Sequence, residues 1–447
     1  MSAHLAKVAT LCAFAPSLFG TAASSKVSVI DAPYIETVPF QFTYSDYYPK
    51  APQWGEIPEK CCIGQVVAAP DQKTVLKFDS GSVYVASRNA KTYKDQARQS
   101  NAAAYQIDAV DASAIAGLKD PSSQFLTTPD GGLVAVVSST GVVPVQCNLA
   151  SGNASPACSA GDEAAFDFGT IVDVAFSGGS DNAWEFLVVS SSGLHKVSTA
   201  AFPAKCTVQT FDQVPQTGLT AVGVAPFTGK ASSRASGTST AFVAGAQHLY
   251  LINSDTGDVT HKEWISNVTS GAGGAVDGPV STMAFDAHDQ RLVLGTEGAL
   301  NVFAPTLRIT RVAHREGLPY GNVTAIASRV TQQSVMGALK TPESQVWIGT
   351  KMGVAVWQES NDPDWRYLFG PRWHPGTAVK ALAIHEAATT QIGNAMESVP
   401  ATIVVATDGG VSFLEQQEWT LAVRCLFVCF LSMARALQSL ALFSLPT

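Results

Sequence analysis

Three stretches of the chain repeat one phrase: LVLGTEGALNVF at 292–303, VWIGTKMGVAVW at 346–357 and IVVATDGGVSFL at 403–414. Each reads as a buried strand, a Gly-Thr or Ala-Thr step, a short turn that ends in Gly, and a second alternating strand. Repeats of this kind stack on one another and bury faces that no single copy could bury alone. The phrase therefore decides the fold class before any single residue is considered.

The same phrase continues toward the N-terminus in weaker copies. These copies are SVYVASRN at 82–89, LVAVVSSTGVVPV at 133–145, EFLVVSSSGLHKV at 185–197 and AFVAGAQHLYLI at 241–252. A short apolar strand precedes each copy, at 64–69, 123–128, 172–176, 220–225, 281–285, 323–327 and 379–384. Units at a spacing of roughly 40 to 60 residues are typical of four-stranded propeller blades. We predict an all-β fold, a β-propeller of seven blades of four-stranded antiparallel sheet over residues 24–419.

Composition and charge agree with a large β fold and exclude one class of function. Hydrophobic residues make up 46% of the 447 residues, which is enough to fill a large core, and the chain holds 36 Gly and 23 Pro for turns. Charged residues make up only 14%, the net charge is −8, and no Lys/Arg run occurs. A nucleic-acid partner is not expected, because such proteins carry a basic stripe or patch.

The N-terminus has the three regions of a secretory signal. MSAHLAK carries one Lys and no acidic residue, VATLCAFAPSLFG is apolar, and GTAASS supplies small residues for cleavage. This order predicts a signal peptide over residues 1–23, cut near Ala23. The alternative is a buried N-terminal strand or helix, which Pro16 and the polar segment after it disfavour. We therefore expect an extracellular, secreted protein.

Cysteines and sequons fit secretion. Cys147 and Cys158 flank a Gly/Ser/Pro-rich loop, and a disulfide between them would hold the two ends of this long loop together. Cys206 has Cys61 and Cys62 as candidate partners, and the sequence leaves that pairing open. Asn-Val-Thr sequons at Asn267 and Asn322 are predicted glycosylation sites. No spacing of metal ligands is present, so neither a metal nor a cofactor is expected.

The C-terminal segment 420–447 differs from everything before it. It is apolar, Leu-rich and almost free of Gly. Arg424 and Arg435 interrupt it, whereas a membrane span needs about 20 continuous apolar residues. We read it as a hydrophobic tail outside the propeller, either a truncated or aberrant end or a weak membrane segment. In the second case the propeller would be tethered to a membrane, through this tail alone.

One blade resembles a known repeat. HREGLPYGNVTAIASRV at 314–330, followed by ESQVWIGTKMGVAVW at 343–357, resembles the two-component-regulator propeller family. The matching residues are Gly317, Leu318, Pro319, Asn322, Val323, Ile326, Trp347, Ile348, Gly349, Thr350 and Gly353. The resemblance implies a seven-bladed, ligand-sensing propeller, which in bacterial sensors is extracytoplasmic and binds polysaccharide-derived signals. No recognisable transmembrane helix leads into a kinase here, so histidine-kinase signalling does not carry over.

The residues that make the phrase recognisable have structural explanations. Gly298, Gly353 and Gly409 follow tight turns, where a positive φ is expected. Trp347 lies in a strand where a large apolar plate fills the space between blades. Pro319 and Asn322 shape the entry to an inner strand. Residues 27–43 read as strand-like and could complete the last blade, which begins at Val379, and so close the ring.

A ligand site is expected in the connections between blades, which run across one face of a propeller. By strand count these connections are 260–279, 311–322 and 365–378. The last two are dense in residues that hold sugars or anions: His314, Arg315, Tyr320, Arg372, Trp373 and His374. An aromatic ring stacks on a sugar face while Arg and His donate hydrogen bonds. The structural alternative is that Trp373 packs between blades and Arg372 pairs with a carboxylate.

These observations favour a recognition module over an enzyme. The preferred ligand is a carbohydrate or another cell-surface component. Propellers also host catalysis, so a polysaccharide hydrolase or lyase is the alternative, and a protein-binding scaffold is the third hypothesis. His314 with Glu316, or His374 with Asp364, would be acid–base pairs if they came within reach of each other. In FDAHDQR at 285–291 the acidic residues are expected to form a hairpin turn rather than a site.

Overall fold

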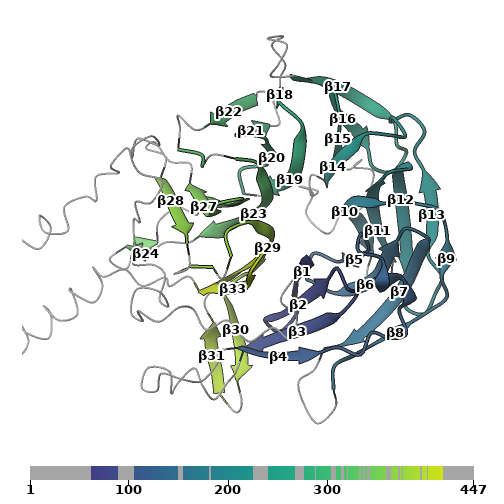
Figure 1. Ribbon diagram of the computed structural model, residues 1–447, viewed down its shortest axis with the longest axis horizontal. Coiled ribbons are helices and arrows are strands. Elements are labelled where there is room, and N and C mark those ends of the chain that lie inside the picture. Colours follow the sequence, from purple (N-terminus) through teal and green to yellow (C-terminus); the bar gives the residue numbers. More distant parts are fainter. Residues whose placement is uncertain are drawn as a thin grey trace, which may run out of the picture.

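Seven antiparallel sheets, one for each predicted unit, are arranged as blades around a central axis (Figure 1). The structure is a computed structural model that describes residues 62–88, 105–149, 155–180, 183–224, 240–266, 276–286, 288–303, 309–313, 317–319, 321–331, 334–335, 338–339, 343–358, 364–370, 373–374, 376–392, 395–399 and 401–415. The predicted signal peptide, strand-like segment 27–43 and tail 420–447 lie outside these residues. Within the described ranges, no helix has the length and hydrophobicity of a membrane span.

The first four blades follow the order of the chain. Blade 1 consists of β1 (Ile63–Ala69), β2 (Lys73–Phe78), β3 (Val83–Arg88) and β4 (Tyr105–Ala109). The short 3-10 helix η1 (Ala116–Lys119) leads into blade 2, formed by β5 (Gln124–Thr127), β6 (Leu133–Ser138), β7 (Gly141–Asn148) and β8 (Ala157–Ala160), with β9 (Ala164–Ala165) also paired to β7. Blade 3 consists of β10 (Ile171–Ser180), β11 (Ala183–Ser190), β12 (Gly193–Ala200) and β13 (Thr207–Thr210). Blade 4 consists of β14 (Leu219–Val224), β15 (Thr240–Gly245), β16 (His248–Asn253), β17 (Val259–Ser266) and β18 (Val276–Asp277).

The last three blades contain the strongest copies of the repeated phrase. Blade 5 consists of β19 (Val280–Asp286), β20 (Arg291–Thr296), β21 (Ala299–Phe303) and β22 (Ile309–Ala313). Blade 6 consists of β23 (Val323–Thr331), β26 (Glu343–Thr350), β27 (Gly353–Gln358) and β28 (Asp364–Phe369), with the hairpin of β24 (Ser334–Val335) and β25 (Ala338–Leu339) inserted after β23. Blade 7 has three described strands, β29 (Val379–His385), β32 (Thr402–Thr407) and β33 (Gly410–Glu415), and a separate hairpin of β30 (Ala388–Ile392) and β31 (Ala395–Val399).

The seven predicted first strands are confirmed as the innermost strands of the blades. β1, β5, β10, β14, β19, β23 and β29 lie around the centre of the ring, and neighbouring first strands contact one another (Figure 1). Six of them carry a β-bulge at the same place, directly after the first residue of the strand. A bulge increases the local twist of a strand, so the repeated bulge gives the inner wall one recurrent geometry.

The hydrophobic interior is divided among the seams between blades. Seven clusters of buried residues each combine apolar side chains from two neighbouring blades, including one cluster shared by blades 7 and 1. Trp347 is 0% exposed and belongs to the cluster between blades 6 and 7. The predicted role of this indole as inter-blade packing is therefore confirmed.

The Thr of the repeated phrase closes the turn between the second and third strands of a blade. Its hydroxyl donates to the backbone oxygen three residues later: Thr296 to Ala299 (3.1 Å), Thr350 to Gly353 (3.0 Å) and Thr407 to Gly410 (3.1 Å). Serines make the same bond in blades 2 and 3, from Ser138 to Gly141 (3.3 Å) and from Ser190 to Gly193 (3.5 Å). The repeated phrase therefore specifies the turn between the second and third strands as well as the strands themselves.

Two of the three predicted positive-φ glycines are confirmed and one is displaced. Gly298 has φ 84° and Gly353 has φ 129°. In the third copy the left-handed residue is Gly410, with φ 140°, rather than Gly409. The turn at Asp408 holds two glycines in a row, and the one that begins β33 adopts the conformation that a side chain disfavours.

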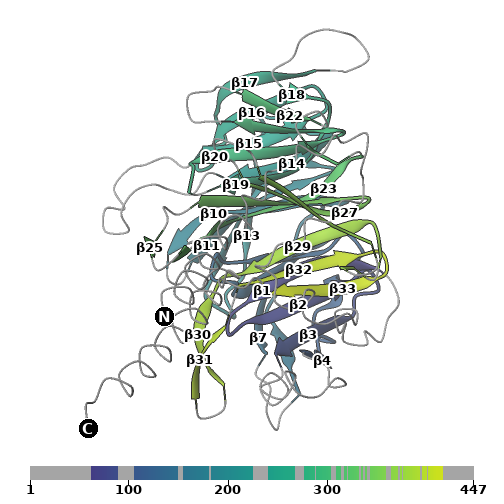
Figure 2. The same ribbon diagram turned by 90° about the vertical axis from the view of Figure 1, so that its left-hand side faces the viewer.

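Blade 7 packs against blade 1, so the ends of the array meet. Figure 2 shows β29, β32 and β33 beside β1 and β2. The Tyr105 and Phe413 rings stack across this boundary with centroids 3.9 Å apart. Residues 27–43, predicted to complete blade 7, lie outside the described residues, and the ring is closed here by the packing of described side chains.

Candidate functional site

One face of the ring carries the turns between second and third strands, at 79–82, 139–140, 191–192, 246–247, 297–298, 351–352 and 408–409. The connections from each outermost strand to the next innermost strand run across the same face, which we call the connection face. Several connections are bonded to these turns. The Asp120 carboxylate accepts from Ser139 N (2.7 Å), and that of Asp408 accepts from Thr377 N (2.9 Å).

The predicted connections begin later than the sequence suggested. Parts of 260–279, 311–322 and 365–378 belong to the outermost strands β17, β22 and β28, because these strands are longer than expected. The chain between β22 and β23 is 314–322, and the chain between β28 and β29 is 370–378. Of the six predicted ligand-binding residues, four fall outside the described part of the chain: His314, Arg315, Tyr320 and Arg372.

The other two predicted residues are buried. Trp373 and His374 are each 1% exposed, and Trp373 belongs to the cluster between blades 6 and 7. His374 Nε2 lies 2.9 Å from Leu368 O and Nδ1 lies 2.7 Å from Ser412 Oγ. Because a carbonyl only accepts, Nε2 carries the proton and Nδ1 accepts from the Ser412 hydroxyl. In this structure both side chains fasten the connection to the core, as the structural alternative for Trp373 described.

Burial also decides the charge of His374. Desolvation lowers its pKa to about 4, against a smaller opposing effect of the bond to Leu368. The imidazole is therefore neutral at pH 7. Acid–base work with Asp364 would require an accessible ring, and the ring is enclosed by its two hydrogen-bond partners.

The preceding connection is fastened in a similar way. Leu318 is 0% exposed in the cluster between blades 5 and 6, and Gly317 and Pro319 beside it are buried. Gly317 has φ 107°, and a Cβ there would lie 2.6 Å from Cδ1 of Trp365. The Gly-Leu-Pro segment therefore packs between blades 5 and 6, and the contact with Trp365 explains why position 317 needs a glycine.

The outermost strand β28 brings the two predicted connections together. The Tyr367 hydroxyl donates to Gly317 O at 2.6 Å, so the connection before blade 6 lies against the strand that leads into the connection after it. The two segments were predicted from strand count and composition, and this bond shows that they are neighbours. Both are fastened by buried residues.

β28 also carries a row of aromatic rings, in a segment that was predicted to be a connection between blades. Trp365, Tyr367 and Phe369 alternate along the strand and are half-buried. The Trp365 and Tyr367 rings are 6.2 Å apart with an interplanar angle of 4°, and those of Tyr367 and Phe369 are 5.6 Å apart. The signal was the alternation W-R-Y-L-F, which is the period of a strand with one apolar face.

The inner wall contains one carboxylate in an unusual position. Asp173 lies at the bulge of β10 and accepts from Val174 N and Val222 N, both at 2.9 Å, so it joins blades 3 and 4. Desolvation raises its pKa to about 6, although both hydrogen bonds lower it. Its side chain keeps partial exposure, and the densely packed strands around the residue account for the desolvation. No sequence signal marks this residue, because its environment comes from the next blade.

The turn FDAHDQR holds a buried ion pair. Asp286 Oδ2 accepts from Arg291 Nε (3.0 Å) and from Ser344 Oγ of blade 6 (2.6 Å). The Arg291 guanidinium lies 5.1 Å from the Trp357 ring, and Asp289 is 3.0 Å from Arg291 Nη2. The predicted hairpin turn is confirmed between β19 and β20. Asp286 joins blade 5 to blade 6 on the face opposite the connection face.

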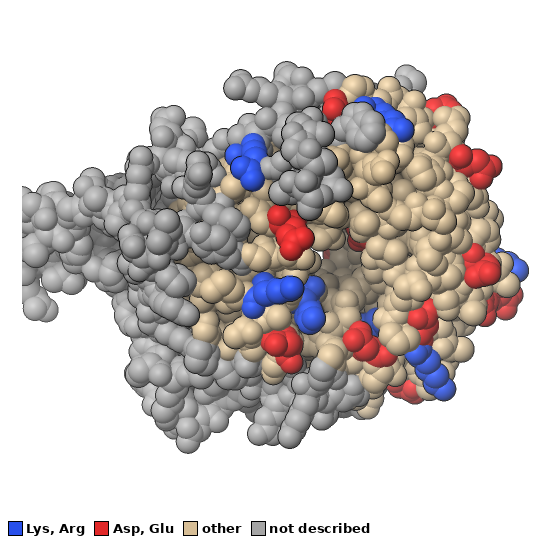
Figure 3. Space-filling view, turned by 45° about the horizontal axis from the view of Figure 1, so that its top comes forward, with Lys and Arg blue, Asp and Glu red and all other residues tan. Residues whose placement is uncertain are grey.

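Charged side chains are sparse on the described surface. In Figure 3, Lys/Arg and Asp/Glu groups lie singly or in small mixed groups, and several border the hollow near the middle of the ring. No group of three or more metal-ligating side chains occurs among the described residues.

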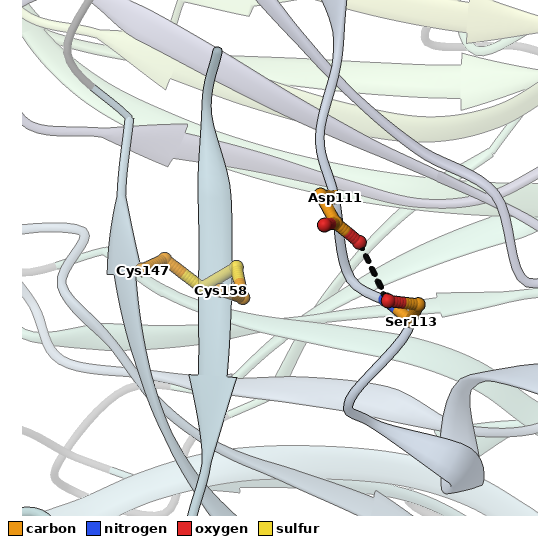
Figure 4. The surroundings of a disulfide bond; sticks show 4 residues. All are labelled: Asp111, Ser113, Cys147 and Cys158. Carbon is orange, nitrogen blue, oxygen red and sulfur yellow. Dashed lines mark hydrogen bonds between the residues drawn. A yellow bond between two sulfur atoms is a disulfide. The ribbon is translucent and has the colours of Figure 1, made fainter. Parts of the chain in front are cut away.

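The cysteines divide into bonded and free. Cys147 of β7 and Cys158 of β8 face each other in register and form a disulfide with an S–S distance of 2.02 Å (Figure 4). Cys62 is also disulfide-bonded, to a partner outside the described residues. Cys206 is a free, buried thiol, so the candidate pairing of Cys206 with Cys61 or Cys62 is wrong. Burial raises the pKa of this thiol to about 11.

Only one of the two predicted glycosylation sites lies in the described part of the chain. Asn322 is half-exposed on the connection face, where its backbone bridges Glu297. The Thr324 hydroxyl of the same sequon donates to Val379 O at 2.8 Å. Asn267 is outside the described residues, and glycosylation at both positions stays a prediction.

No family model and no curated protein matches the chain. The structure is similar to Sqt1 of Saccharomyces cerevisiae, with a TM-score of 0.48 and 13% identity over 78% of this chain and 83% of that one. It is also similar to the extracellular domain of BT4673 from B. thetaiotaomicron, with a TM-score of 0.44 and 14% identity over 81% of this chain and 39% of that one. A second structure of that domain gives a TM-score of 0.43 and 12% identity.

Proposed function

We propose that this protein is an extracellular recognition propeller that binds a carbohydrate, or another cell-surface component, on its connection face over blades 5 to 7. The observation that carries the proposal is the Tyr367 to Gly317 hydrogen bond of 2.6 Å. It makes neighbours of the two connections whose composition suits sugar binding. The Cys147–Cys158 disulfide supports an oxidising compartment.

The anchors and the binding groups are different residues in this proposal. Leu318, Trp373 and His374 are buried and fasten the connections. Tyr320 and Arg372 are proposed as binding residues, with His314 and Arg315 beside them. Each lies within four residues of a buried anchor in the chain. An aromatic ring with nearby guanidinium groups suits a sugar carrying hydroxyl or carboxylate groups.

Two alternatives stay open as proposals, a polysaccharide hydrolase or lyase and a protein-binding scaffold. A hydrolase or lyase would need an acid and a base within reach of the bound glycan. His374 is buried and neutral, so it does not favour catalysis.

The test is a glycan array probed with the full secreted chain and three variants. Tyr320→Ala and Arg372→Ala are expected to weaken binding at least about tenfold, the usual scale for removal of a binding side chain. Lys205→Ala is the matched control, because Lys205 is exposed between β12 and β13 of blade 3. Circular dichroism should show the same β signal in all four proteins.

Each outcome separates the proposals. Binding that is lost in both variants and kept in the control supports recognition at this face. Turnover of a bound glycan would replace the binding module by the hydrolase or lyase. A folded protein that binds no glycan on the array would leave the protein scaffold.

A further inference from the structure

Four of the seven seams between blades are tied at the inner wall by one repeated device. A side chain at the start of a first strand bonds to the backbone of the next first strand. Gln65 bonds to both the amide and the oxygen of Phe125, Asp173 accepts from Val222 N, Ser281 donates to Val323 O (2.5 Å) and Thr324 donates to Val379 O (2.8 Å). These ties join blade 1 to 2, 3 to 4, 5 to 6 and 6 to 7.

The seam between blades 7 and 1, which we call the closure seam, lacks this tie, as do the described parts of the seams between blades 2 and 3 and between blades 4 and 5. In β29 the position that matches Ser281 and Thr324 is Lys380. Lys380 is exposed and makes no hydrogen bond or ion pair with any other described residue. The closure seam is also where the first and last blades of the array meet. Each of the other seams is crossed by the chain itself.

Side chains at the far end of β29 hold the closure seam instead. His385 Nε2 lies 2.8 Å from Thr74 Oγ1 of blade 1, and both residues are buried. Next to them, Gln72 Nε2 donates to Glu386 O at 3.1 Å. The described apolar contacts in this seam include the stacked Tyr105 and Phe413 rings. A titratable imidazole is thus a buried polar tie of this seam.

We propose that His385 makes ring closure sensitive to acid, because protonation of its buried imidazole loosens the contact between blades 7 and 1. The cause is the cost of burying a charge without a counter-ion, since an imidazolium could still donate to the Thr74 oxygen. His385 is 6% exposed.

The charged groups around His385 do not supply that counter-ion. Asp71 and Lys73 are the charged residues next to Thr74 in the chain of blade 1. His385 forms no ion pair with either of them or with any other described residue. Blade 6 contributes Arg329, whose Nη2 lies 3.4 Å from Glu386 Oε2, and the Glu386 side chain is 59% exposed. Glu386 is therefore both solvated and engaged with Arg329.

The direction of titration agrees with the geometry. Desolvation lowers the pKa of His385 from 6.5 to about 4. The neutral form is favoured while the seam is closed, so the stabilisation is complete above pH 6.5 and is lost as the pH falls toward 4. Acidification in this range should open the closure seam before the other seams whose ties carry no histidine.

Hydrogen exchange with mass spectrometry on the full chain, corrected for intrinsic rates, tests this inference. We expect protection of 63–69 and 379–385 to fall about tenfold per pH unit below 6.5. Protection of 240–253 in blade 4 should fall less. In His385→Gln, whose amide can bond to Thr74 and cannot titrate, the extra fall should disappear. In His374→Gln it should remain, which separates this seam from the other buried histidines.

Two results would overturn the inference. One is equal loss of protection in blade 4 and at the closure seam of the wild-type protein. The other is an unchanged pH response in His385→Gln. If that variant does not fold, the wild-type protein decides alone. Linkage to one proton requires the logarithm of the protection factor at the closure seam to fall by about one unit per pH unit between pH 6 and 5.

Discussion

Gly295 of blade 5 lies directly against Val323 of blade 6, and a Cβ added at position 295 would lie 2.5 Å from Val323 Cγ1. The next copy of the phrase repeats this relationship between Gly349 and Val379, again at 2.5 Å. The Gly of the Gly-Thr step is therefore needed because the next blade leaves no room for a side chain there. It differs from the glycine later in the phrase, which is needed for its positive φ.

Enlarging this glycine should separate two blades. Gly349→Val is expected to destabilise the protein by about 1–3 kcal/mol, because the core must shift to admit the added atoms. Urea unfolding measures the change. Ala406, which is buried in the third copy at the matching position, provides the control: Ala406→Gly should cost only about 1 kcal/mol. An unchanged unfolding midpoint in Gly349→Val would contradict the contact.

The threonine of the same step should contribute through its hydroxyl. Thr350 is 0% exposed, donates to Gly353 O and accepts from Met352 N. Thr350→Val keeps the shape and leaves two buried backbone groups without this partner, so a loss of about 1–3 kcal/mol is expected. The exposed Thr377→Val should change the melting temperature far less. Equal effects of the two substitutions would show that the turn does not depend on the hydroxyl.

Asp173 should give the protein a component of stability that rises on acidification. Its pKa is raised from 3.8 to about 6, so the folded state favours the protonated form. The stabilisation is present below pH 3.8 and is lost as the pH rises through 6. Asp173→Asn removes this titration, but it also removes one of the two acceptors, because an amide nitrogen cannot accept from a backbone N–H. The stability of the variant relative to the wild-type protein should therefore rise by on the order of 2 kcal/mol between pH 4 and pH 8, because partial exposure moderates the effect, and a constant difference across this range in denaturant titrations would refute the assignment.

His195 should act in the opposite direction. It is 1% exposed, and desolvation lowers its pKa from 6.5 to about 4. Its Nε2 lies 3.0 Å from Ser192 Oγ and its Nδ1 lies 3.2 Å from Thr210 Oγ1. The neutral ring stabilises the fold above pH 6.5, and this contribution is lost toward pH 4. His195→Gln should be less stable than the wild-type protein at pH 8 and should approach it at pH 5, as judged by thermal melting.

The disulfide should contribute as a cross-link of blade 2. Cys147 and Cys158 are 11 residues apart, and closing a loop of this size is worth ~3 kcal/mol. The double variant Cys147→Ala/Cys158→Ala should lose this amount in urea unfolding at neutral pH. The seam between blades 3 and 4 should keep its hydrogen-exchange protection in that variant, because the cross-link lies within one blade.

The strand pattern was readable from sequence because it repeats. All seven innermost strands were predicted to begin within one residue of their observed start, since each is a short apolar run placed before a copy of the phrase, but β10 and β23 extend four residues beyond the predicted ends. Trp347 was assigned correctly for the same reason: its position in the phrase determines its neighbours. A local sequence pattern is enough to predict strands and packing where every blade has the same kind of neighbours.

The candidate site was harder, because burial depends on partners far along the chain. Trp373 and His374 sit in a segment rich in cations and aromatics, which reads as a surface. They are buried because Ser412 and Leu368 meet the imidazole and because blade 7 covers the indole. The unusual environment of Asp173 could not be predicted for a related reason, since its hydrogen-bond donor Val222 N belongs to another blade.

The free thiol of Cys206 has a consequence for how the protein is made. It is 3% exposed in the cluster between blades 2 and 3, close in sequence order to the bonded pair. Until that cluster forms, the thiol competes with Cys147 and Cys158 for oxidation, and a mismatched bond would hold the chain in a misfolded state. Yield in an oxidative refolding experiment should therefore depend on whether packing or oxidation comes first, and Cys206→Ala should make the outcome independent of that order.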